Sequence, residues 1–99
     1  MNSLQQKACG FIASHYGLEK QRNQTYQELS ELICVLSKRE DQKDQNYKDA
    51  VIDEIADSEI MIEQMRQLHG ISMGELKDRI NFKLNRQLAR IEAEKSGSP

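Results

Sequence analysis

Apolar residues recur along this chain at the three- and four-residue spacing of helices that bury one face, and the pattern predicts four such helices. The first covers residues 3–15, and Gly17 follows it as a candidate C-terminal cap. The second runs from about Leu18 to Arg39, with a narrow apolar stripe after a polar, glutamine-rich beginning. The first of these helices is expected to cover one side of a bundle.

A polar stretch, Glu40 to Asn46, separates the second helix from two further helices. The third is expected over residues 47–69, with Asn46 as its N-terminal cap and Gly70 as its end. The fourth follows Ser72, because Ser72-Met73-Gly74-Glu75 has the form of a capping box, in which two side chains satisfy free backbone N–H groups. Its apolar stripe consists of Leu76, Ile80, Leu84, Leu88 and Ile91.

The third helix differs from the others because its apolar residues spread around most of its circumference. A helix of this kind is buried on more than one side, and a chain of 99 residues offers few neighbours to bury it. We therefore expect an all-α fold, in which four helices form a bundle that a second subunit completes. One domain over residues 1–95 and a flexible tail over residues 96–99 complete this prediction. The apolar positions are Val51, Ile52, Ile55, Ala56, Ile60, Met61, Ile62, Met65 and Leu68.

Charge and composition narrow the functional classes. The net charge of −2 gives no basic surface for duplex nucleic acid, so no nucleic-acid partner is expected. No apolar run approaches the roughly 20 residues of a membrane span, so no membrane partner is expected either. Cys9 and Cys34 fall inside helical patterns, which favours packed, reduced thiols over a disulfide and hence a cytoplasmic location.

Two pairs of acidic residues supply the candidate chemistry. Glu28 and Glu31 lie on the second helix, and Glu54 and Asp57 lie on the third. Residues three apart on a helix are about 5–6 Å apart at Cβ, and carboxylates held that close repel unless a proton or a cation lies between them. If the two helices face each other, four carboxylates converge on one divalent-metal site. The alternative is that both pairs lie on solvated helix faces, where such pairs are common.

The residue types indicate which metal would bind. Carboxylates without a nearby histidine or cysteine favour Mg²⁺, or Mn²⁺, over zinc or copper. A di-iron bundle would require Glu-x-x-His on paired helices, and Glu31 and Asp57 stand where those histidines would be. A hard cation is therefore expected in preference to redox iron.

The same residues carry a resemblance to a known family. The order Glu-x-x-Glu, polar loop, Glu-x-x-Asp and apolar helix resembles the MazG-type nucleoside triphosphate pyrophosphohydrolases of the all-α superfamily, especially short phage-type members. Here the motifs are Glu28-Leu29-Ser30-Glu31 and Glu54-Ile55-Ala56-Asp57, and the likeness extends from about Tyr16 to Ile91. The chain departs from the family at Gln27, where many members have Glu, and at Ser58, where many have Val.

The resemblance implies hydrolysis of a (deoxy)nucleoside triphosphate between its α and β phosphates, by a homodimer or a dimer of dimers. Glu28, Glu31, Glu54 and Asp57 would be the Mg²⁺ ligands. Glu31, or else Glu28, would take the proton from the attacking water.

Basic residues are needed to balance the charge of a triphosphate. Lys38 is the best placed, because it follows Glu31 by two helical turns. Lys83 and Arg86 are further candidates, and a solvated basic face explains them nearly as well. Two alternatives to an enzyme stay open: a helical interaction module without catalysis, and a nucleotide-binding regulator that has lost turnover.

Overall fold

The computed structural model describes residues 1–97, and within that range it contains four α-helices, one short 3₁₀-helix and no strand. The all-α class and the four predicted helices are confirmed. Ser96 and Gly97 form a turn after the last helix, whereas Ser98 and Pro99 of the predicted tail lie outside the described residues. The elements are α1 (Ser3–Tyr16), α2 (Leu18–Leu36), η1 (Glu40–Gln42), α3 (Tyr47–Leu68) and α4 (Met73–Lys95).

Helix ends largely follow the sequence signals. Gly17 adopts a φ of +87°, a conformation that favours glycine, and its N–H donates to the Ala13 carbonyl at 2.8 Å. The chain therefore passes from α1 to α2 through a single residue. Ser72 forms the predicted capping box with Glu75, through hydrogen bonds of 3.0 and 2.8 Å.

Two predictions at the turn between α2 and α3 are wrong. The second helix ends at Leu36, three residues early, and Ser37 is its C-terminal cap. Lys38 is therefore not on the helical face that carries Glu31. Asn46 makes no side-chain cap, and the loop is held instead by its N–H donating to the Asp44 carboxylate at 2.9 Å.

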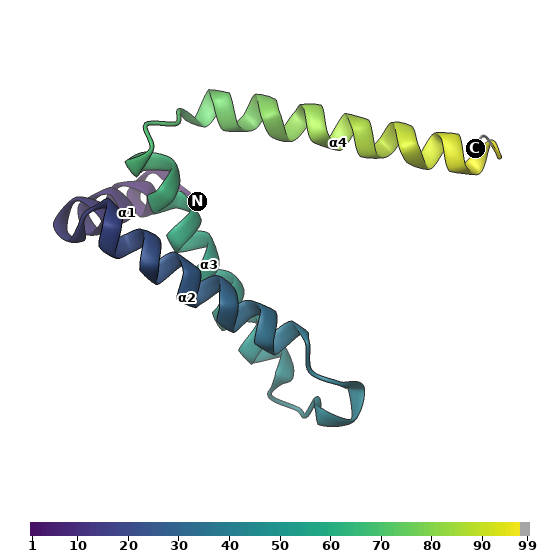
Figure 1. Cartoon of the computed structure of the whole chain (residues 1–99), viewed down its shortest axis with the longest axis horizontal. Coiled ribbons are helices and arrows are strands. Elements are labelled where there is room, and N and C mark those ends of the chain that lie inside the picture. Colours follow the sequence, from purple (N-terminus) through teal and green to yellow (C-terminus); the bar gives the residue numbers. More distant parts are fainter. Residues whose placement is uncertain (98–99) are drawn as a thin grey trace.

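The first three helices pack together, with α2 antiparallel to α3 and α1 lying against both (Figure 1). Their shared interior is small and unusually polar. Gln64, which is only 1% exposed, accepts a hydrogen bond of 2.7 Å from the Gln21 amide. Cys9 is buried as predicted, whereas Cys34 is an exposed thiol, contrary to the expectation that both would be packed. The buried apolar residues are Cys9, Ala13 and Met61.

Helix α4 projects away from the other three and does not pack against them (Figure 1). The chain consequently has a radius of gyration of 17.3 Å, whereas a compact domain of this length has about 13 Å. Its accessible surface is 7789 Å², against about 5,800 Å² for a folded monomer of this mass. No helix within residues 1–97 has the length and apolarity that crossing a bilayer requires.

Candidate metal centre

The register of α2 against α3 positions the two acidic pairs. Gln21 and Gln64 contact each other across the antiparallel helices. Seven residues further along α2 is Glu28, and seven residues back along α3 is Asp57. Equal steps along antiparallel helices keep residues opposite one another, since each residue advances both helices by about 1.5 Å. Glu28 therefore faces the turn of α3 that carries the second acidic pair.

Three of the four predicted ligands come together. Three carboxylate oxygens lie within 4.8 Å of one another, one each from Glu28, Glu54 and Asp57. Glu28 and Glu54 are half-buried at the α2–α3 contact, and Asp57 is exposed. The arrangement is thus open to solvent on one side and enclosed on the other.

On the enclosed side of this group, two carboxylate oxygens accept no hydrogen bond. The Glu28 Oε2 and Glu54 Oε2 atoms are buried and have no hydrogen-bond partner, while the other Glu28 oxygen accepts from the Gln24 amide at 2.8 Å. No lysine or arginine in the described part of the chain forms an ion pair with Glu28, Glu54 or Asp57. Buried carboxylate oxygens require a proton, a donor or a cation.

The pKa values of Glu28 and Glu54 are both raised above their ordinary value. Loss of hydration is the main cause that raises the pKa of Glu28, and the charges of Glu31 and Asp57 add to it, against an opposing hydrogen bond from Gln24. Loss of hydration also raises the pKa of Glu54, together with the charges of Glu31, Asp57 and Glu28. A bound proton or a cation would relieve this repulsion, and no basic side chain within residues 1–97 pairs with Glu28, Glu54 or Asp57.

Glu31 lies at the edge of this cluster. Its carboxylate does not belong to the group within 4.8 Å, yet it is near enough to raise the pKa of both Glu28 and Glu54. It accepts a long hydrogen bond of 3.4 Å from the Gln27 amide. Glu31 is thus a half-buried carboxylate beside the three converging acids, and its side-chain contact with Glu28 is one of the causes that raise the pKa of Glu28.

The predicted phosphate-binding residues are not part of the cluster. Lys38 lies in the exposed loop after α2. Lys83 and Arg86 are exposed on α4, where the Arg86 guanidinium lies 5.8 Å from the centre of the Phe82 ring. Because α4 does not pack against α2 or α3, neither Lys83 nor Arg86 approaches the acids of its own chain.

The residues match a hard cation in their chemistry. Three carboxylates from two helices supply oxygen donors only, and two of their oxygens are buried and unpaired. Mg²⁺ binds oxygen ligands through one or two carboxylates and retains several waters, and the solvent-facing side of this cluster leaves room for water. The sequence did not single out Gln24 or Ser58, although Gln24 precedes Glu28 by one helical turn and Ser58 directly follows Asp57.

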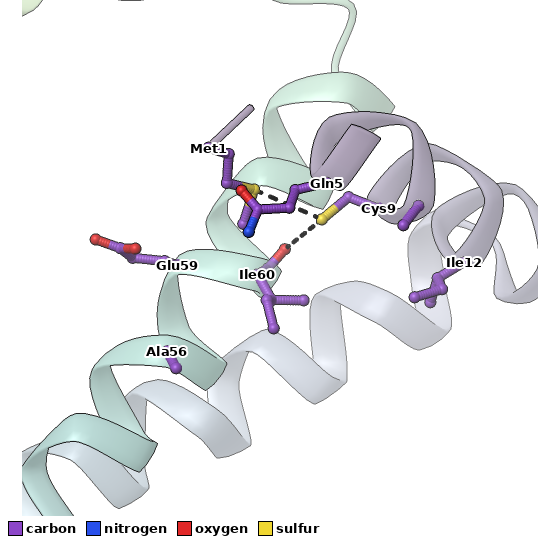
Figure 2. A pocket seen from close by; sticks show the side chains of 8 residues that line it. Met1, Gln5, Cys9, Ile12, Ala56, Glu59 and Ile60 are labelled. Carbon is purple, nitrogen blue, oxygen red and sulfur yellow. Dashed lines mark hydrogen bonds between the residues drawn. The ribbon is translucent and has the colours of Figure 1, made fainter. Parts of the chain in front are cut away.

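A separate cavity of about 350 Å³ lies between α1 and α3 (Figure 2). The Cys9 thiol lies in it, 3.9 Å from both the Ile60 carbonyl and the Met1 sulfur. Burial raises the pKa of Cys9, and the charge of Glu63 adds to the effect, so this thiol is not an activated nucleophile. None of the four acids lines the cavity. Its walls are Met1, Gln5, Ala8, Cys9, Ile12, Ala56, Glu59 and Ile60.

Comparison with known proteins adds no relative on which to base a function. No family model matches the chain, and neither a curated protein nor a solved structure matches it.

Proposed function

We propose that this protein is a Mg²⁺-dependent nucleoside triphosphate pyrophosphohydrolase. It would cleave a (deoxy)nucleoside triphosphate to the monophosphate and pyrophosphate, as a housecleaning enzyme of the cytoplasmic nucleotide pool. The observation that carries this proposal is the convergence of Glu28, Glu54 and Asp57 with two buried oxygens left unpaired. The motif order Glu-x-x-Glu and Glu-x-x-Asp, with its resemblance to MazG-type enzymes, supports the reaction class.

Each acid has a part in this proposal. Glu28, Glu54 and Asp57 would hold the cation, which when bound neutralises the polyphosphate and lowers the pKa of a coordinated water. Mn²⁺ would occupy the same oxygen donors. Glu31, at the edge of the cluster, would complete the ligand set or accept the proton of the attacking water, with Glu28 as the alternative base.

The phosphate groups need positive charge that the acidic cluster lacks. Lys38 is in a loop of the same chain, whereas Lys83 and Arg86 would have to come from the α4 of a second copy. Charge favours such an exchange, because α3 carries six acidic and two basic residues and α4 carries six basic and four acidic ones. A homodimer is accordingly part of the proposal, with a dimer of dimers as its extension.

The exposed surface supports association. Each chain exposes about 2,000 Å² more than a folded monomer of its mass, so a dimer would bury about 4,000 Å², within the range of obligate interfaces. A groove of about 340 Å³ runs between α3 and α4, and Ile62, Leu76 and Ile80 line it from both helices. Ile52 and Ile55 extend the apolar surface along α3, where they are 52% and 43% exposed.

That same surface favours the second candidate function, a non-catalytic helical interaction module. A further alternative is a nucleotide-binding regulator, in which the acids would bind metal and triphosphate without hydrolysing the triphosphate. Both alternatives account for the exposed apolar side chains of α3 and α4. The interaction module does not explain why three carboxylates converge without a neutralising partner, whereas the regulator does, because its acids bind the metal.

A panel of nucleoside triphosphates, assayed for pyrophosphate with and without Mg²⁺, tests the proposal. The wild type is expected to release pyrophosphate only with the metal, and Asp57→Asn is expected to release none. Asp49→Asn, which removes an exposed acid from the first turn of the same helix, is the matched control and should keep activity. Metal-linked triphosphate binding without release would indicate the regulator. Absence of both would indicate the interaction module.

A further inference from the structure

Ser58 is a buried hydroxyl with no partner. The residue is 3% exposed, and its Oγ atom makes no hydrogen bond. Within residues 1–97, the buried side-chain oxygens without a partner are Glu28 Oε2, Glu54 Oε2 and Ser58 Oγ. Glu28 lies on α2, and Glu54 and Ser58 lie one turn apart on α3, which packs against α2.

Three hydroxyls on α2 and at its C-terminal cap show what Ser58 does not do. Thr25, Ser30 and Ser37 each donate to the carbonyl four residues back, at 2.7, 2.8 and 2.6 Å. This bond is the ordinary way in which a helical serine or threonine satisfies its hydroxyl. Ser58 makes no such bond to the Glu54 carbonyl, so its proton is free for another acceptor.

The position of Ser58 directs that proton toward the acids. Ser58 directly follows Asp57 and lies one turn after Glu54 on the same face of α3. Side chains on an α-helix tilt toward its N-terminus, so the Ser58 side chain lies over the turn that carries Glu54. Its burial places it at the helix contact and not in solvent. The acid one turn earlier on this face is Glu54, whose Oε2 atom is also buried and unpaired.

We propose that Ser58 is a positioning residue of the metal centre, whose hydroxyl donates a hydrogen bond to a ligating carboxylate, that of Glu54, when a cation is bound. The inference rests on the proposed function. A charge-assisted hydrogen bond of this kind holds a ligand in one orientation. Groups that orient metal ligands in this way commonly contribute 10- to 100-fold to metal affinity.

A purely structural role makes a different prediction. If Ser58 is present only because a small residue lets α2 and α3 approach, alanine serves equally well and metal affinity does not change. The hydroxyl also leaves an unsatisfied polar atom in the metal-free protein, and replacing such an atom by an apolar one removes that cost. The proposal therefore requires opposite effects on metal affinity and on metal-free stability.

The test is Mn²⁺ titration of the full chain, with free Mn²⁺ followed by electron paramagnetic resonance, beside thermal melts without metal. Ser58→Ala is expected to weaken Mn²⁺ binding by about 10-fold or more and to raise the metal-free melting temperature. The isosteric pair Ser58→Thr and Ser58→Val controls for volume, and Thr is expected to bind Mn²⁺ about 10-fold more tightly than Val. Ser30→Ala, on the exposed face of α2, should leave Mn²⁺ affinity unchanged.

Two failures are distinguishable in this experiment. If the wild type binds Mn²⁺ and Ser58→Ala and Ser58→Val bind it equally well, the role of Ser58 is overturned and the metal centre stands. If the wild type binds no Mn²⁺, the metal centre itself is overturned, and the role of Ser58 with it.

Discussion

The side-chain amide of Gln21 donates a 2.7 Å hydrogen bond to the side-chain oxygen of Gln64, and both residues are almost fully buried between α2 and α3. A buried polar pair permits only the alignment in which its members meet, because any other alignment leaves two amides unsatisfied. The same alignment brings Glu28 opposite Asp57. The candidate site therefore depends on a hydrogen bond two helical turns away from it.

Replacing one member of this pair should destabilise the fold. Gln64→Met keeps the volume but leaves the Gln21 amide buried and unpaired, which is expected to lower the free energy of unfolding by about 1–3 kcal/mol. Adding Gln21→Met removes the unpaired group, so the double variant should recover much of the loss. Urea denaturation of the two single variants and the double variant gives the coupling free energy. Additive effects would show that the two amides do not depend on each other.

The pH dependence of the metal-free protein follows from the acidic cluster. Burial raises the folded-state pKa of Glu28 and Glu54 above the ordinary value of 4.5. The folded protein therefore binds more protons than the unfolded chain above that pH, and the contribution of these groups to stability falls as pH rises through the folded-state pKa. Thermal melts from pH 5 to 8 should show this decline, and Mg²⁺ should reduce it. A stability that rises over this range would contradict the clustered arrangement.

Asp57→Asn separates charge repulsion from structure. The substitution removes one charge from the cluster and keeps the size of the side chain, so the metal-free protein should melt at the same temperature or higher. Mn²⁺ binding should be lost in the same variant, because one of three converging ligands is gone. The measurement is a melt with and without metal for the wild type and the variant. A sharp drop in metal-free melting temperature would mean that Asp57 is a structural residue.

The sequence predicted where the helices lie along the chain more reliably than how they end and what they pack against. Apolar spacing located α1 and α3 to within one residue at each end, and Gly17 and Ser72 marked real helix boundaries. The end of α2 was missed because Ser37 and Lys38 give no stop signal of the kind that Gly17 gives at the end of α1.

The candidate site was predictable in part. Three-residue spacing placed Glu54 beside Asp57, and the pairing of α2 with α3 brought Glu28 to them. The position of α4 was not predictable from its amphipathic pattern, because that pattern requires a partner without saying whether the partner belongs to the same chain. Lys83 and Arg86 were named from their charge and from the family resemblance, and their separation from the acids is a property of the tertiary structure.

The ion pair of Glu63 with Arg66 should govern stability in acid. Glu63 accepts from the Arg66 Nε at 2.9 Å, and Arg66 also donates to the Ile71 carbonyl at 2.7 Å, which holds the turn before α4. Hydrogen bonds from Arg66 and then Gln67 lower the pKa of Glu63, against the opposing effect of burial. This contribution is present above pH 4.5 and lost as pH falls through the lowered value.

Glu63→Gln is therefore expected to lower the free energy of unfolding at pH 7 by about 1.5–3 kcal/mol, because it removes the charge from a buried hydrogen-bonded pair. The difference from the wild type should shrink as pH falls below 4.5, because Glu63 of the unfolded chain then binds a proton while the folded-state pKa is lower. Denaturation at pH 7 and pH 3.5 measures both values. A difference that is independent of pH would mean that packing, and not the ion pair, causes the loss.

Association through α3 and α4 predicts that stability depends on protein concentration. Folding of a dimer is favoured by mass action, so the melting temperature should rise as the protein is concentrated.

Leu84→Glu places a charge in the apolar stripe of α4 and should shift sedimentation to the monomer, with a lower melting temperature. Arg79→Glu, on the basic side of α4, should weaken the dimer less and in a salt-dependent way. Asp78→Asn, which alters an exposed acid on the same helix, is the control. If the wild type sediments as a monomer at all concentrations, a second copy does not cover the apolar stripe of α4. Lys83 and Arg86 are then excluded from the proposed site, because they reach it only from a second copy.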